Sequence, residues 1–267
     1  MLFAMLSSFS KNKYLFFQML KRDIQQRYRG SQLGFLWAFF YPILMLLVYT
    51  FVFSIVMKAK WGVEGTNNIG FGLILFTGLL CHGLLAEVVV GAVGLITGNS
   101  QYVKKVVFPL EILTLVSLSN ALFHMFLGML ILLTIFVLTG NALHWTMLLA
   151  PVVIAPLVIF LLGASWFISV LGVYVRDLSQ FIGVLMTVLL FLGPIVYPFS
   201  AIPEQLQPYV LWLNPLSVVV ESLRAVLLFG QMPNWTHLGI YTLGALAMFG
   251  FGAWFFQRTR DGFADVI

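Results

Sequence analysis

The polar residues that could do chemistry in this chain are few, and they form no catalytic pattern. The sequence lacks a Gly-x-x-x-x-Gly-Lys-[Ser/Thr] loop, so it has no usual cradle for the phosphates of ATP. It also lacks the His-Glu-x-x-His and Gly-x-Ser-x-Gly patterns of zinc and serine hydrolases. The four histidines are scattered, and a single cysteine excludes an internal disulfide framework. The remaining polar residues indicate recognition of charge rather than catalysis.

A short polar interruption, residues 98–109, holds the adjacent lysines Lys104 and Lys105 between two long apolar runs. If those runs are membrane helices, the interruption lies outside the bilayer, and its lysines favour the cytoplasmic side. The lysine pair is then either a topology anchor or a contact for a partner protein. Glu111, just after Pro109, either complements the dipole of the next helix or touches that partner.

Two other carboxylates lie in apolar surroundings. Glu87 falls inside an apolar run, where a charge is costly unless it has a partner or faces a water-filled path. We expect either a structural hydrogen bond or a place on such a path. Glu221 and Arg224 are spaced i,i+3, which predicts that they pair with each other.

The composition predicts an all-α integral membrane protein. The chain has 267 residues, of which 61% are hydrophobic and 9% charged, whereas soluble domains carry about 25% charged residues. The net charge of +5 does not indicate nucleic-acid binding, because the charges collect in loops and at chain ends. We therefore expect no nucleic acid among the partners.

Apolar runs of bilayer length divide the chain into three parts. We expect a cytoplasmic N-terminus at 1–33, a six-span domain at 34–256 and a cytoplasmic tail at 257–267. Prolines repeatedly break residues 200–236, which predicts external re-entrant helices between the last two spans. The predicted spans are about 34–57, 69–97, 109–138, 146–175, 178–199 and 237–256.

The basic stretch 11–29 predicts an amphipathic helix that lies along the membrane surface. Phe17, Leu20, Ile24 and Tyr28 fall on one face of that helix, and Asp23 can pair with Arg27 at i,i+4 on the other side. No cleaved signal peptide is apparent, so the first span would direct insertion. With six spans, eleven of the 14 Lys and Arg residues fall on one side, which predicts cytoplasmic termini.

Four segments carry a family resemblance: RYRGSQLGFLW at 27–37, YVKKVVFPLEIL at 102–113, VRDL at 175–178 and LNPL at 213–216. In this order they resemble the entry to span one, the loop after span two, the break after span four and the external segment of ABC-2 type polysaccharide export permeases. Arg224 follows the last of them at the expected place. Within that family the chain is most similar to O-antigen (lipopolysaccharide O-polysaccharide) export permeases, with capsule and teichoic-acid exporters as close relatives.

The resemblance implies a homodimer in the bacterial inner membrane, assembled with two copies of a separate ABC ATP-binding subunit. ATP and Mg would bind that subunit, so this chain would need no cofactor and would not itself be an enzyme. The cargo would be a glycan linked to polyprenyl pyrophosphate, within membrane lipid. An ion-coupled secondary transporter and a glycan-transfer enzyme are the alternatives from other classes. An ion-coupled transporter requires several intramembrane ionisable residues. A glycan-transfer enzyme requires a cluster of acids, bases or metal ligands.

The resemblance also assigns roles to residues. Segment 99–107 would be the coupling helix that meets the ATP-binding subunit, and Arg176 and Asp177 would serve a gate unless they only cap a helix with Gln180. A glycan path needs flat aromatic faces and few fixed charges. The coupling candidates are Asn99, Gln101, Tyr102, Val103, Lys104, Lys105 and Glu111; the candidates for the interface or the lipid pyrophosphate are Arg22, Arg27 and Arg29. The channel candidates are Trp37, Phe40, Tyr41, Glu87, Phe191 and Tyr197; the gate candidates are Arg176, Asp177, Glu221 and Arg224.

Overall fold

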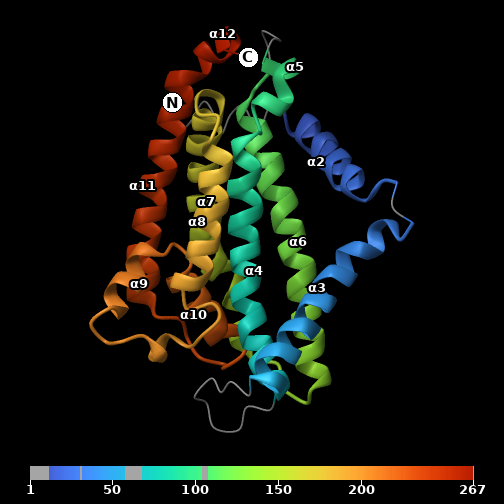
Figure 1. The fold of residues 1–267 in the computed structure, drawn as a ribbon, viewed down its shortest axis with the longest axis vertical. Coiled ribbons are helices and arrows are strands. Elements are labelled where there is room, and N and C mark those ends of the chain that lie inside the picture. The colour runs from blue at the N-terminus through green and yellow to red at the C-terminus, as the bar shows by residue number, and fades with distance from the viewer. Residues whose placement is uncertain (1–11, 31, 58–67, 104–107, 267) are drawn as a thin grey trace.

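The protein is all-helical, as its apolar runs predict (Figure 1). The structure is a computed structural model that describes residues 12–30, 32–57, 68–103 and 108–266. Among those residues every regular element is a helix and no strand occurs. This confirms the all-helical part of the predicted fold class.

The first helix, α2 (Lys13–Tyr28), is separated from the first apolar span by a turn with two left-handed glycines. Gly30 has φ +88° and Gly34 has φ +50°, which lie in a backbone region that residues with a Cβ atom rarely adopt. The span then begins with η1 (Gly34–Leu36), continues as α3 (Trp37–Tyr49) and ends in the π-helical segment η2 (Thr50–Val56). The two glycines allow the chain to leave α2 in a new direction.

Five helical segments in the described part of the chain are long and apolar enough to cross a membrane. The fifth predicted span forms a shorter helix, α8, of 15 residues, below the roughly 20 that a bilayer needs. The helices of this part are α4 (Asn68–Val93), η3 (Thr97–Asn99), α5 (Ser100–Val103), α6 (Glu111–Leu138), η4 (Trp145–Leu149), α7 (Ala150–Tyr174), α8 (Leu178–Leu192), η5 (Phe199–Ala201), α11 (Trp235–Thr259), η6 (Arg260–Gly262) and α12 (Phe263–Val266).

Between α8 and α11 lies a bent pair of helices, α9 (Gln207–Leu213) and α10 (Ser217–Leu227), which meet at 94°. The bend falls at Asn214-Pro215, because the residue before a proline is pushed out of the helical region. The Asn214 side chain stabilises the bend: its Nδ2 donates to the Leu189 carbonyl, and its Oδ1 accepts from the Leu216 amide at 2.9 Å. The geometry is that of a broken span or a re-entrant loop.

The two ends of the bundle carry different elements. Figure 1 shows α5, α12 and the turn between α7 and α8 at one end, with α2 leaning toward that end, and α9 and α10 at the other. The basic residues of α2 therefore lie toward the same end as the 97–103 segment.

The core is built around α4, α7 and α11, and glycines let these helices approach closely. A Cβ at Gly163 would meet the α11 backbone at 2.5 Å, and a Cβ at Gly172 would reach the carbonyl of Val93. Two thirds of the α4 span is buried, whereas only 11% of the first span is. The first span is thus peripheral to the packed core of this single chain.

Candidate functional site

Helix α2 packs along α6 through an apolar face. Phe16 and Met19 are buried in one cluster with Leu113 and Val116 of α6. The predicted face was partly wrong, because Phe17 is 61% exposed, whereas Leu20, Ile24 and Tyr28 are half-buried. The true contact face lies one position earlier in the helix at its N-terminal end.

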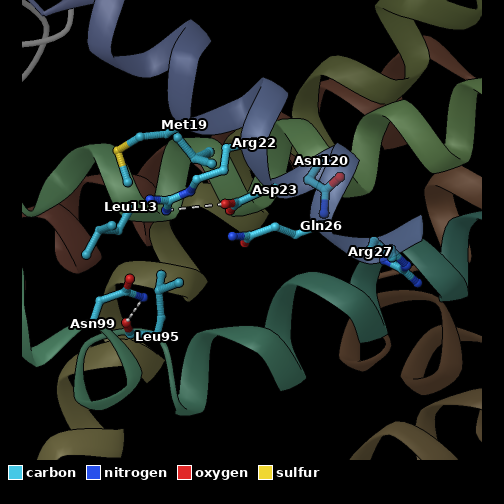
Figure 2. A pocket seen from close by; sticks show the side chains of 10 residues that line it. Met19, Arg22, Asp23, Gln26, Arg27, Leu95, Asn99, Leu113 and Asn120 are labelled. Carbon is cyan, nitrogen blue, oxygen red and sulfur yellow. Dashed lines mark hydrogen bonds and ion pairs between the residues drawn. The ribbon is translucent and has the colours of Figure 1, made fainter. Parts of the chain in front are cut away.

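A pocket of about 490 Å³ lies between α2, the end of α4 with η3, and α6 (Figure 2). Its volume is within the usual range of ligand pockets, and its walls mix charged, amide and apolar groups. In Figure 2, Arg22, Asp23 and Gln26 of α2 lie on one side of the open space and Asn99 of η3 on the other, while Arg27 lies farther along α2. The lining residues are Met19, Arg22, Asp23, Gln26, Arg27, Leu95, Asn99, Leu113, Val116 and Asn120.

A direct contact joins α2 to the predicted coupling segment. Arg22 Nη1 donates to the Tyr102 hydroxyl at 3.1 Å, and the Tyr102 ring stacks on Phe108 with centroids 4.5 Å apart. The hydrogen bond to Tyr102 raises the pKa of Arg22 above its usual value, so the guanidinium stays charged. Asn99, beside them, donates from Nδ2 to the Leu95 carbonyl at 2.8 Å. Residues 97–103 thus lie against the basic helix.

The acidic residue of α2 does not pair as its spacing predicts. Asp23 Oδ1 lies 3.5 Å from Arg22 Nη2, and Arg27 is engaged elsewhere, so the predicted Asp23–Arg27 pair is wrong. Partial burial raises the pKa of the Asp23 carboxyl, and the Arg22 charge opposes that rise only in part. Arg22 is therefore placed between Asp23 and Tyr102.

A second polar contact links three helices, and we call it the α2–α4–α6 cluster: Arg27, Glu87 and His124. Arg27 Nη1 contacts Glu87 Oε1 directly and lies 3.2 Å from His124 Nδ1. His124 Nδ1 lies 2.9 and 3.1 Å from the two oxygens of Glu87. Of the two predicted roles for Glu87, the structure supports the hydrogen-bonded one. His124 was not among the predicted site residues, because its partners are far away along the chain and no local pattern marks it.

The predicted coupling residues fall into three groups. Lys104 and Lys105 lie outside the described residues. Gln101 is exposed on α5, whereas Asn99, Tyr102 and Val103 are half-buried. Glu111 is buried in the first turn of α6, where a carboxylate complements the helix dipole.

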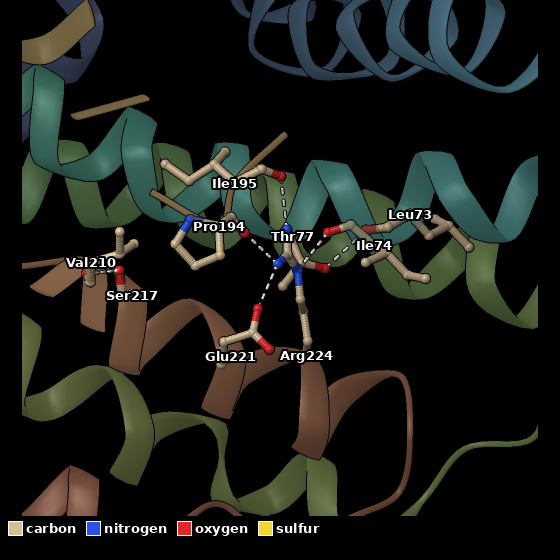
Figure 3. A network of polar contacts seen from close by, with 9 residues as sticks. All are labelled: Leu73, Ile74, Thr77, Pro194, Ile195, Val210, Ser217, Glu221 and Arg224. Atoms are coloured by element: carbon tan, nitrogen blue, oxygen red, sulfur yellow. Dashed lines mark hydrogen bonds and ion pairs between the residues drawn. The ribbon is translucent and has the colours of Figure 1, made fainter. Parts of the chain in front are cut away.

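At the other end of the bundle Arg224 forms what we call the α10 cluster (Figure 3). Its guanidinium is fully buried and donates to the carbonyls of Ile74, Pro194 and Ile195, at 3.0 Å from Nε to Ile74 and 2.8 Å from Nη2 to Ile195. Nη1 also donates to Glu221 Oε1 at 2.8 Å, which confirms the predicted i,i+3 pair. This one side chain ties α10 to α4 and to the turn after α8.

The four predicted gate residues are not brought together. Arg176 and Asp177 are exposed in the turn between α7 and α8, at the end opposite to α10. Asp177 occupies the N-cap position of α8, but its side chain makes no capping hydrogen bond, so the capping box expected with Gln180 is wrong. A gate role for either pair stays a prediction.

The aromatic channel candidates lie on the outside of this single chain. Trp37, Phe40 and Tyr41 are between 44% and 63% exposed on α3, and Phe191 is 60% exposed on α8. Tyr197 donates its hydroxyl to the Phe191 carbonyl at 2.9 Å. In the described ranges no group of three His, Cys, Asp or Glu could hold a metal ion. The groups that this chain presents are therefore the ion pairs and amides around the pocket and the exposed aromatic faces of α3 and α8.

Comparison with known proteins extends along nearly the whole chain. The family model of the ABC-2 type transporter matches residues 14–228. The O-antigen export system permease protein RfbA of Myxococcus xanthus is 28% identical over 254 residues, 95% of either chain, and RfbA of Klebsiella pneumoniae is 26% identical over 248 residues, 92% of either chain. The polysialic acid transport protein KpsM of Escherichia coli is 27% identical over 245 residues, 91% of this chain and 90% of its own.

Proposed function

This chain belongs to the ABC-2 type transporter family, and we propose that it is the membrane permease subunit of an ATP-driven exporter of a polysaccharide. The observation that carries the proposal is the match to O-antigen export permeases over more than nine tenths of both chains. The five apolar spans supply the multi-pass membrane body that such a subunit needs.

The assembly that we propose is a homodimer with two copies of a separate ABC ATP-binding subunit, in the bacterial inner membrane. ATP and Mg bind the partner, because this sequence has no phosphate-binding loop. In this assembly both termini face the cytoplasm, since eleven of the 14 Lys and Arg residues fall on the side of the termini when the chain makes six spans. The peripheral first span, little buried within one chain, is available for contact with the second subunit.

Coupling in this proposal runs through segment 99–107. Movement of the ATP-binding subunit presses on this segment, and the Arg22–Tyr102 hydrogen bond passes the displacement to α2. Arg22, Arg27 and Arg29 place positive charge where a lipid pyrophosphate would arrive at the cytoplasmic surface. The exposed aromatics of α3 and α8 then offer flat faces for the sugar rings of a sliding glycan.

The test is ATP-dependent export by the permease reconstituted with its ATP-binding subunit. Lys104→Glu with Lys105→Glu should abolish export while the protein still inserts, because the charge reversal repels the partner at the coupling segment. Lys58→Glu with Lys60→Glu is the matched control, since it makes the same double reversal in the predicted loop on the other side. Normal export from the 104–105 variant would remove the coupling assignment.

A capsular polysaccharide is the second candidate cargo, because the polysialic acid transport protein is matched at nearly the same identity. Complementation separates the two. The gene is introduced, with its ATP-binding partner, into strains that lack either an O-antigen permease or a capsule permease. We expect surface glycan to return in the O-antigen strain, and its return only in the capsule strain would reverse the order of the two candidates.

A further inference from the structure

The α2–α4–α6 cluster brings together side chains that lie far apart in the sequence. Arg27 and Glu87 are separated by 60 positions, and Arg27 and His124 by 97. Each residue comes from a different helix, and each contacts both of the others. The cluster is therefore a point at which three helices meet through charged groups rather than through apolar packing.

Aromatic rings pack beside the histidine of this cluster. The Tyr28 ring meets His124 edge-on, with centroids 6.2 Å apart, and meets Phe35 at 5.4 Å. Phe35 in turn packs on Phe123, which precedes His124 on α6. These contacts restrict the position of the His124 ring, which lies against both Glu87 and Arg27.

The cluster also fixes the register of α2 on α6. Met19 and Val116 line one part of the pocket, and Arg27 contacts His124 farther along. The number of residues from Met19 to Arg27 equals that from Val116 to His124. Every α-helix rises by the same distance per residue. Equal spacing between the two pairs of contacts therefore means that α2 and α6 run side by side. The α2–α6 contact therefore has an apolar start and a charged end.

We infer that Glu87 and His124 are positioning residues, which with Arg27 make α2 move as one body with α4 and α6. This inference rests on the proposed function, because it concerns the path of movement from the coupling segment. Tyr102 contacts α2 at Arg22, and the cluster contacts the same helix five residues later at Arg27. A push on segment 97–103 therefore reaches α4 and α6 through α2 as well as through the chain itself.

Charged groups suit this task because apolar side chains can slide past one another, whereas paired charges specify one register. The Arg27 side chain is half exposed at the edge of the pocket, and Glu87 is about one-quarter exposed. The pair thus lies at a boundary, where desolvation costs less than in the centre of the bundle. A variant there can lose the register without losing the fold.

The test measures export per ATP hydrolysed in the reconstituted complex. Glu87→Gln keeps the shape and removes the charge, so we expect export per ATP to fall about tenfold while ATP hydrolysis continues. Lys21→Glu is the matched control on an exposed position of α2 and should export normally.

A covalent link supplies the second arm. In a Cys81→Ser background that also carries Glu87→Gln, cysteines replace Gln26 of α2 and Asn120 of α6, which line the same pocket. A reducible bis-thiol linker should restore export per ATP, and reductant should abolish it again. If Glu87→Gln lowered export only by damaging the fold, the linker would not restore export per ATP.

Each outcome bears on one proposal. Wild-type export per ATP in Glu87→Gln, or continued uncoupling after complete cross-linking, would overturn the positioning role. A wild-type complex that hydrolyses ATP without moving glycan would instead overturn the proposed function.

Discussion

Arg224 and Arg27 lie toward opposite ends of the same bundle, and they are held in different ways. Arg224 is fully buried, and three of its partners are backbone carbonyls, from Ile74, Pro194 and Ile195. The Arg27 side chain is half exposed, and its partners are the side chains of Glu87 and His124.

The two clusters hold their helices by different means. Backbone carbonyls keep their places as long as the helices do, so the α10 cluster holds α10 against α4 in one arrangement. The side-chain partners of Arg27 lie at a half-exposed site, where an ion pair is desolvated at smaller cost. The α10 cluster therefore supports the fold itself, whereas the α2–α4–α6 cluster specifies how α2 sits on α4 and α6.

The largest expected effect comes from Arg224→Lys. A lysine carries its three donors on one nitrogen and cannot reach all the acceptors that are spread around the Arg224 guanidinium, so buried carbonyls lose their partners. We expect a loss of about 3 kcal/mol or more in stability, seen as little folded protein in the membrane and a lower melting temperature in detergent. Arg258→Lys makes the same change at an exposed position of α11 and should be silent. Equal melting temperatures of the two variants would show that the buried contacts of Arg224 do not stabilise the fold.

Gly78→Ala tests the space around the same guanidinium. A Cβ at Gly78 would lie 2.9 Å from Arg224 Nη2 and 3.3 Å from the Ile195 backbone, which cannot give way easily. Overpacking of this kind costs about 1–3 kcal/mol, measured as a lower melting temperature. Gly83→Ala on the same helix meets nothing within 4 Å and should instead be neutral or stabilising. A stable Gly78→Ala would mean that the α10 cluster is looser than its contacts indicate.

Tyr102→Phe tests the contact between α2 and Tyr102 at the other end of the bundle. The change removes the hydroxyl that accepts from Arg22 and keeps the ring that stacks on Phe108. We expect the melting temperature to change little, because a polar contact to a charged side chain at an exposed site typically contributes only about 1 kcal/mol. Export per ATP should nevertheless fall. Tyr14→Phe, on an exposed part of α2, is the control, and an equal result from both would separate Tyr102 from coupling.

The smallest expected effect is that of Asp23→Asn. The raised pKa of Asp23 means that the folded protein binds its proton more tightly than the unfolded chain does. This group therefore favours folding fully below the unfolded pKa, and that contribution is lost as pH rises through the folded pKa. Removing the charge should raise the melting temperature slightly at neutral pH and leave it unchanged at acid pH. The opposite pH trend would show that the Arg22 pair outweighs burial.

Local sequence patterns predicted those structural features that depend on residues close together in the chain. The apolar runs predicted the helices, because a bilayer-length apolar segment satisfies its backbone only as a helix. The i,i+3 spacing predicted the Glu221–Arg224 pair, since such residues lie on one helical face. The same reasoning failed for Asp23 and Arg27, because a stronger partner from another helix was available.

Composition and periodicity act over a few turns of chain, and they were enough to predict an all-helical membrane protein with a basic first helix, a polar interruption after the second apolar run and a broken segment before the last. The contacts of Arg27 with Glu87 and His124, and of Arg224 with carbonyls 29 to 150 positions away, could be found in the folded protein alone. These contacts depend on how the helices are placed against one another, and contacts between distant segments follow no regular spacing in the sequence.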